Sequence, residues 1–235
     1  MTPTKRRRLL LTACIAVIAA VTLFIQEDNY RHIAPETEVL SSTQGDLAMK
    51  TLDELPVKGR APKTGYARSE FGDGWESALG CDTRNTILRR DLLDTIVDEN
   101  CRVLSGVLND PYTGATISFV RGASTSQAVQ IDHVVALSNA WQTGAQQLSK
   151  NERIALANDP LELLAVDGPA NQQKSDGDAA TWLPPNKAFR CQYVARQVAV
   201  KQKYRLWVTP PEKEAIVRVL TSCPGQKLPM AKPAS

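Results

Sequence analysis

Hydrophobic residues recur along this chain with two different spacings, one typical of helices and one typical of strands. Residues 83–100, "TRNTILRRDLLDTIVDEN", predict a single helix because apolar residues recur at helical spacing, at Ile87, Leu88, Leu92, Ile96 and Val97. Residues 110–120, "DPYTGATISFV", predict a turn that leads into a β-branched strand. "AVQIDHVVAL" (128–137) and "LELLAV" (161–166) predict two more buried strands, which would pair as a hairpin.

Helix signals occupy most of the remaining domain, in the segments 138–148, 149–159, 167–182, 185–207 and 211–223. The second of these begins at Ser149, a capping residue, with Glu152 at the capping-box position. Pro169 stands near the first position of the third helix, where its missing N–H does no harm. We therefore expect an α+β fold, with a mostly helical domain around a small β-hairpin.

The N-terminal region differs from the rest of the chain. Lys5, Arg6, Arg7 and Arg8 precede an uncharged, mostly apolar run over residues 9–25, a pattern typical of a secretory signal or a short membrane anchor (1–25). Residues 26–65 are rich in Ser, Thr, Pro, Glu and Lys and predict a flexible tether. The folded domain should cover residues 66–223, and 224–235 should be a disordered tail. The protein would be secreted, or anchored to the outer face of the membrane through its N-terminal segment alone.

Composition and cysteine usage fit one exported globular domain. The 235 residues are 43% hydrophobic and carry a formal charge of +3, which permits a polyanionic partner without requiring one. Besides Cys14, the chain has four cysteines, an even number that predicts two structural disulfides in an exported protein. Of the three possible pairings we expect the short-range one, Cys81–Cys101 with Cys191–Cys223. The absence of a CxxC pair argues against a zinc knuckle.

Candidate chemistry concentrates on the predicted hairpin and the helix after it. Asp132 and His133 are adjacent on the first strand, and Asn171 and Lys174 lie on the helix. Adjacent side chains of a regular strand face opposite sides, so the first two share a cleft only if the strand bends or ends there. Carboxylate and amide oxygens suit a hard divalent cation, and a neutral histidine can accept a proton from water. Such a set suits phosphodiester hydrolysis, although an Asp-His pair in an apolar strand is more often structural.

These stretches resemble the HNH, or His-Me finger, nucleases, whose core is a ββα fold around one metal ion. "IDHVVAL" is similar to the family's first strand, "LELLAV" to its second, and "PANQQKSD" to the start of its helix. Residues 66–223 look closer still to exported actinobacterial HNH proteins related to the C-terminal nuclease domain of GmrSD-type restriction enzymes. That likeness is carried by "GWESALGCDTRNTILRRDL", "SGVLNDPYTG", "WLPPN" and "CQYVARQVAVKQKY".

The resemblance implies a metal-dependent endonuclease that hydrolyses nucleic acid, with DNA favoured over RNA. His133 would be the general base, Asp132 and Asn171 would hold Mg²⁺ or Mn²⁺, and Lys174 would contact phosphate or stabilise the transition state. The helix lacks the final histidine ligand of HNH proteins, which disfavours zinc. The alternative is a non-catalytic nucleic-acid-binding or cell-surface domain with the same fold. No protein partner is inferred.

Further polar residues are candidates for substrate binding, but the sequence supports them less strongly. Arg84 and Asn85, beside Cys81, are candidates for binding phosphate or bracing the site, and a solvated helix start is an equally good interpretation. A basic set on one predicted helix could follow a phosphate backbone, although a solvated face is favoured; it comprises Arg190, Arg196, Lys201, Lys203 and Arg205. The second histidine, His32, lies in the tether and is expected to be inert.

Overall fold

The computed structural model describes residues 47–78, 80–123 and 125–229. The expected signal or anchor (1–25), the first part of the tether and the last six residues of the tail lie outside these ranges. Within them, none of the helices has the length and apolar character needed to span a membrane.

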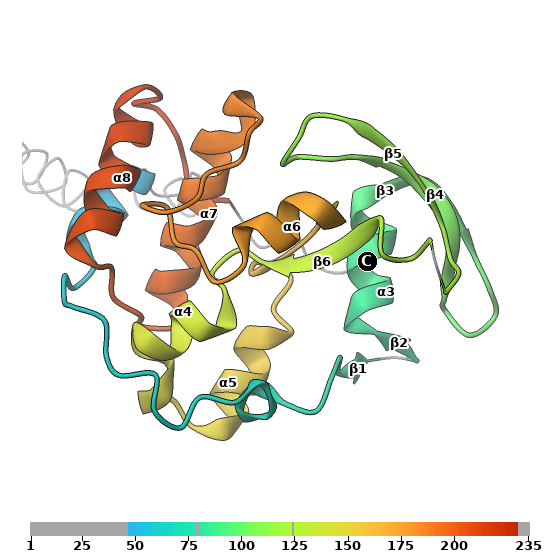
Figure 1. The fold of residues 1–235 in the computed structure, drawn as a ribbon, viewed down its shortest axis with the longest axis horizontal. Coiled ribbons are helices and arrows are strands. Elements are labelled where there is room, and N and C mark those ends of the chain that lie inside the picture. Colours follow the sequence, from blue (N-terminus) through green and yellow to red (C-terminus); the bar gives the residue numbers. More distant parts are fainter. Residues whose placement is uncertain (1–46, 79, 124, 230–235) are drawn as a thin grey trace, which may run out of the picture. The chain divides into compact units, whose positions relative to one another are not determined.

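Helices and antiparallel strands alternate along the described chain (Figure 1). The α-helices are α2 (Ala48–Glu54), α3 (Thr83–Asp91), α4 (Leu137–Gln142), α5 (Lys150–Ala157), α6 (Gly168–Lys174), α7 (Arg190–Lys203) and α8 (Pro210–Thr221). Short 3₁₀ turns are η2 (Arg68–Phe71), η3 (Ala145–Gln147) and η4 (Lys187–Phe189). The strands form three sheets: β1 (Ser77–Ala78) with β2 (Cys81–Asp82); β3 (Leu92–Val97), β4 (Val103–Asn109) and β5 (Thr116–Val120); and β6 (Val129–His133) with β7 (Leu163–Asp167).

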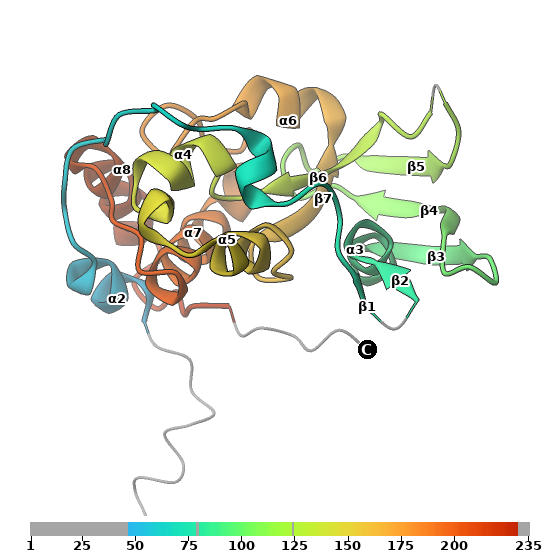
Figure 2. The same cartoon turned by 90° about the horizontal axis from the view of Figure 1, so that it is seen from below.

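The β6–β7 hairpin lies between two hydrophobic cores. One core gathers α2, α4, α5, α7 and α8, and the other gathers α3 and the β3–β4–β5 sheet (Figures 1 and 2). Because strand side chains alternate, Val129 and Ile131 enter the second core, while Leu164 and Val166 of the partner strand enter the first. Both faces of the hairpin are therefore covered, and its residue positions are held from two sides.

Local sequence signals explain several helix starts. Ser149 and Glu152 form the expected capping box of α5, with each side chain bonded to the other's backbone. Asp167 caps α6 through a 2.7 Å bond from the Ala170 amide, and Pro169 occupies its first turn as predicted. The α+β class is confirmed, and a hairpin followed by a helix stands where the ββα core was expected.

The prediction of one helix over residues 83–100 is wrong in its second half. α3 ends at Asp91, and residues 92–97 form β3, which pairs with β4. Ile96 and Val97 are 60% and 37% exposed on this strand, so they do not form the buried helical face that their spacing indicated. The β3–β4–β5 sheet was largely missed, and the description "mostly helical" is only roughly right.

The ends of the folded part also differ from expectation. α2 lies in the segment assigned to the tether, yet Ala48 and Leu52 are fully buried in the first core. The Ala48 amide donates to the Gln226 carbonyl at 2.9 Å, so the start of the predicted tail packs against this helix. The folded domain therefore starts no later than residue 47, and its described part extends to residue 229.

Both expected disulfides are present. Cys81–Cys101 joins β2 to the turn before β4, with Cα atoms 5.3 Å apart. Cys191–Cys223 joins the start of α7 to the segment just after α8, with Cα atoms 6.5 Å apart. Cys191–Cys223 thus ties α7 to the end of α8 in the first core, and Cys81–Cys101 ties β2 to the β3–β4 turn.

Candidate active site

The end of strand β6 places Asp132 and His133 at one cavity. Their backbone positions pair with Leu164 and Leu163, and the regular pairing of the two strands stops there. Both side chains line a cavity of about 600 Å³, which a pair of adjacent residues inside a regular strand would not do. Adjacent side chains of a regular strand face opposite sides, and Asp132 and His133 can share a cavity because the strand ends there.

Asp132 is held by two buried donors. The Lys174 ammonium donates to Oδ1 at 2.9 Å, and the Tyr112 hydroxyl donates to Oδ2. Burial raises the pKa of Asp132, and the nearby Lys174 charge opposes that rise. Lys174 also donates to the His133 carbonyl at 2.8 Å. Its side chain is fully buried and does not line the cavity, so it contacts the carboxylate instead of the space where a substrate would lie.

His133 is an enclosed, neutral imidazole. Its Nε2 lies 3.0 Å from the Ala157 carbonyl, and its ring stacks on Trp75 with 5.7 Å between centroids. The pKa of His133 is lowered to about 3, chiefly by burial and in smaller part by the charges of Arg68 and Lys174, against the opposing effect of the hydrogen bond to the Ala157 carbonyl. A carbonyl only accepts hydrogen bonds, so Nε2 carries the ring proton and Nδ1 keeps its lone pair. The atom able to accept a proton is therefore Nδ1.

Asn171 reaches the same cavity from α6. Its Nδ2 donates to Gln130 Oε1 at 2.9 Å, which fixes the amide orientation; within the described chain, Oδ1 has no hydrogen-bond partner. The start of this helix is fixed by Gly168, whose amide donates to the Ala128 carbonyl at 2.9 Å. A side chain at this glycine would collide with the Gln127 carbonyl, so the close approach of the helix to β6 requires glycine.

Arg84 and Asn85 have separate environments although they are neighbours in sequence. Arg84 lines the cavity and donates to the Val129 carbonyl at 3.2 Å. Asn85 is 4% exposed and lies away from the cavity, where its Oδ1 accepts from the Val103 amide and from Arg121. The site therefore includes Arg84, whereas Asn85 braces α3 against β4.

The cavity also contains residues that sequence reasoning did not identify. Its wall includes Lys63, Tyr66, Arg68, Gln130, Ser138 and Asp176. Arg68 lines both this cavity and a smaller one of about 150 Å³, and His133 also lines both. Tyr112 and Trp75 lie in "SGVLNDPYTG" and "GWESALGCDTRNTILRRDL", stretches that carried the family resemblance, so a signal for them existed. Arg68 gave no signal because it lies outside every motif.

Oxygen donors at the cavity match the preferences of Mg²⁺ or Mn²⁺. Asp132 and Asn171 supply a carboxylate and an amide oxygen, and Asp176 adds a second carboxylate to the wall. Each oxygen of an ionised carboxylate has about two acceptor positions, so the bonds from Lys174 and Tyr112 leave capacity on Asp132. No cluster of three His, Cys, Asp or Glu side chains occurs in the described residues, so protein ligands would have to be completed by water.

Comparisons with known proteins place these residues in a family. Residues 82–219 match the family model described as "GmrSD restriction endonucleases, C-terminal domain". A protein of Arthroderma benhamiae, described as "Uncharacterized secreted protein", is 36% identical over 212 residues, which cover 89% of this chain and 98% of that protein. No solved structure matches. The matched region contains the hairpin, α6 and all the residues that the sequence predicted for catalysis, metal binding and substrate binding.

Proposed function

The chain belongs to the family of GmrSD restriction endonuclease C-terminal domains, and from this premise we propose that it is a metal-dependent endonuclease of the HNH type. Its substrate would be nucleic acid, with DNA favoured over RNA. The observation that carries the proposal is the meeting of Asp132, His133, Asn171 and Arg84 at one cavity. These residues come from three separate elements, and together they supply a base, oxygen ligands and a cation for phosphate.

His133 is proposed as the general base. Its Nδ1 would accept the proton of the attacking water, while the Ala157 carbonyl holds the opposite ring nitrogen in the required tautomer. Burial lowers the pKa of His133 to about 3, which keeps the imidazole neutral at physiological pH and also makes it a weaker base than a free histidine. Trp75 covers one ring face and limits the orientations that the ring can adopt.

Asp132 and Asn171 would hold a Mg²⁺ or Mn²⁺ ion. When bound, such an ion stabilises negative charge on the phosphate and on the leaving oxygen. Lys174 acts through Asp132, because its ammonium fixes that carboxylate and balances its charge at 2.9 Å. It is therefore a positioning residue, whereas Arg84 and Arg68 face the cavity and would contact phosphate directly.

The place of action is proposed to be outside the cell. The related Arthroderma benhamiae protein is described as secreted, and the cationic and apolar N-terminal segment of this chain fits an export signal or anchor. Two disulfides fit an oxidising compartment.

Plasmid cleavage by the purified protein tests the proposal. Nicking and linearisation should require added Mg²⁺ or Mn²⁺, stop with chelator, and fall strongly in His133→Ala. Trp207→Phe is a suitable control, because Trp207 is a buried aromatic residue that does not line the cavity. Binding of DNA without any metal-dependent cleavage would favour the non-catalytic alternative.

A further inference from the structure

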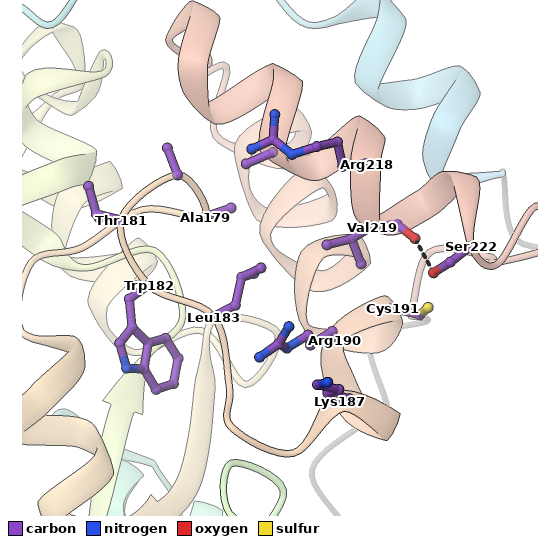
Figure 3. Close-up of a pocket in the computed structure, with 12 residues that line it drawn as sticks. Ala179, Thr181, Trp182, Leu183, Lys187, Arg190, Cys191, Arg218, Val219 and Ser222 are labelled. Carbon is purple, nitrogen blue, oxygen red and sulfur yellow. Dashed lines mark hydrogen bonds between the residues drawn. The ribbon is translucent and has the colours of Figure 1, made fainter.

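A second cavity is lined in part by the loop that follows α6. Its volume is about 560 Å³, and it is bounded by residues 179–183, the start of α7 and the end of α8 (Figure 3). None of its lining residues lines the Asp132 cavity. The loop connects the two, because Ser175 and Asp176 line the first cavity and Ala179 begins the wall of the second.

Three cations line this second cavity. Lys187 lies in η4, Arg190 is the first residue of α7, and Arg218 lies on α8, at the opposite end of the cavity from the other two (Figure 3). No Asp or Glu lines the cavity among the described residues. None of the three cations forms an ion pair within the described chain. A concave surface lined by one sign of charge concentrates the field and attracts ligands of the opposite sign.

The geometry of the arginines suits phosphate. Arg190 Nε donates to the Pro184 carbonyl at 2.8 Å, which anchors the guanidinium and leaves its other N–H groups for a ligand. Planar guanidinium groups bind phosphate through paired hydrogen bonds, which a lysine cannot match. Leu183 and Val219 add apolar surface between the cations, against which a sugar or a base could pack.

We propose that this cavity binds backbone phosphates of the nucleic acid strand whose scissile bond lies at Asp132. The inference rests on the proposed function and extends it, since it assigns a substrate-binding site beyond the cleavage centre. A continuous strand is favoured because one loop lines both cavities, and because the second cavity is open and built largely from exposed or half-buried side chains.

Two triple variants with the same charge change separate a local site from general electrostatics. The first is Lys187→Gln with Arg190→Gln and Arg218→Gln. The control is Lys50→Gln with Lys150→Gln and Lys227→Gln, three exposed lysines that line neither cavity and form no ion pair in the described chain. Thermal unfolding followed by circular dichroism checks that each triple variant remains folded.

Fluorescence anisotropy of a labelled DNA oligonucleotide, in chelator and over a salt series, measures binding without cleavage. The cavity variant should bind at least about tenfold more weakly, and its log–log salt slope should fall by about 0.7–0.9 for each phosphate that the variant no longer neutralises. The control should keep the wild-type slope. Equal losses of DNA affinity in the two triple variants would overturn the inference. It would also be overturned if the cavity variant lost binding of inorganic phosphate but bound DNA as tightly as the wild type.

Cleavage of the same DNA by wild-type protein with Mg²⁺ is measured separately. Cavity-dependent binding without cleavage would overturn the proposed endonuclease activity but support the binding site. Cleavage that is equally efficient in both triple variants would support the proposed endonuclease activity but overturn the binding site.

Discussion

Removal of the Lys174 ammonium should destabilise the fold and the candidate site together. Its Nζ lies 2.9 Å from Asp132 Oδ1, and the two side chains are 0% and 7% exposed. Lys174→Met keeps most of the side-chain volume but leaves a buried carboxylate without its counter-ion. Breaking a buried pair from one side costs about 3–5 kcal/mol, a large share of the roughly 5–15 kcal/mol that stabilises a typical domain.

The chain contains a matched control for this change. Lys201 forms a buried ion pair with Glu212 at 2.9 Å, and both side chains are 0% exposed. Lys201 also donates to the Trp207 carbonyl, much as Lys174 donates to that of His133. Lys201→Met should therefore lower the free energy of unfolding by a similar amount, about 3–5 kcal/mol, yet it lies outside the proposed catalytic cavity.

Urea unfolding at neutral pH measures the two stabilities, and cleavage is then compared at a temperature where both variants are folded. We expect similar losses of stability, with strong loss of cleavage in Lys174→Met alone. Asp132→Asn added to Lys174→Met should restore part of the stability, because it removes the uncompensated charge. A stability loss below about 1 kcal/mol in Lys174→Met, or equal loss of cleavage in both lysine variants, would refute the reasoning.

Further predictions concern the base, the ligand and the disulfides. His133→Ala should lower the cleavage rate by about 10²–10⁴-fold in single-turnover assays while metal affinity is retained, and a small effect would contradict its role as base. Asn171→Ala should weaken Mn²⁺ binding in calorimetry, whereas Asn171→Asp should keep or tighten it and still lower turnover; unchanged affinity in Asn171→Ala would exclude a ligand role. Burial lowers the pKa of His133 from 6.5 to about 3, so its contribution to stability is full above pH 6.5 and is lost as the pH falls toward 3. The stability difference between wild type and His133→Asn should therefore shrink on acidification, by as much as about 5 kcal/mol in urea titrations, and a pH-independent difference would contradict a buried neutral ring. Replacing Cys191 and Cys223 by Ala should cost about 3–4 kcal/mol, slightly more than replacing Cys81 and Cys101, because the sequence separations are 32 and 20 residues; the reverse order in urea unfolding would contradict the chain-entropy reasoning.

Sequence patterns located the hairpin and its neighbours because their signals are local. The capping box of Ser149 and Glu152 acts over one helical turn, and the Asp132-His133 pair is a contiguous motif. Residues 92–97 were misassigned because their apolar spacing fits a helix, whereas pairing with β4 makes them a strand. Tertiary context overrode a local preference at that point.

The partners of the site residues could not be derived in the same way. Tyr112 contacts Asp132 across 20 residues of sequence, and the contact depends on how the turn before β5 packs against the hairpin. Lys174 was assigned to phosphate by its motif, yet burial turns its ammonium toward Asp132 and the His133 carbonyl. The positive charge of a lysine at that position did not indicate whether it would contact a substrate phosphate or the Asp132 carboxylate.

Chemical rescue of His133→Gly tests the central claim most directly. The substitution removes the ring that stacks on Trp75 and leaves a space next to the cavity of about 150 Å³ that both residues line. Metal-dependent DNA cleavage should be lost in this variant and partly restored by added imidazole, with an increase that follows the concentration of neutral imidazole. Cleavage at the wild-type rate without imidazole would contradict the assignment of His133 as the base of a phosphodiester hydrolase.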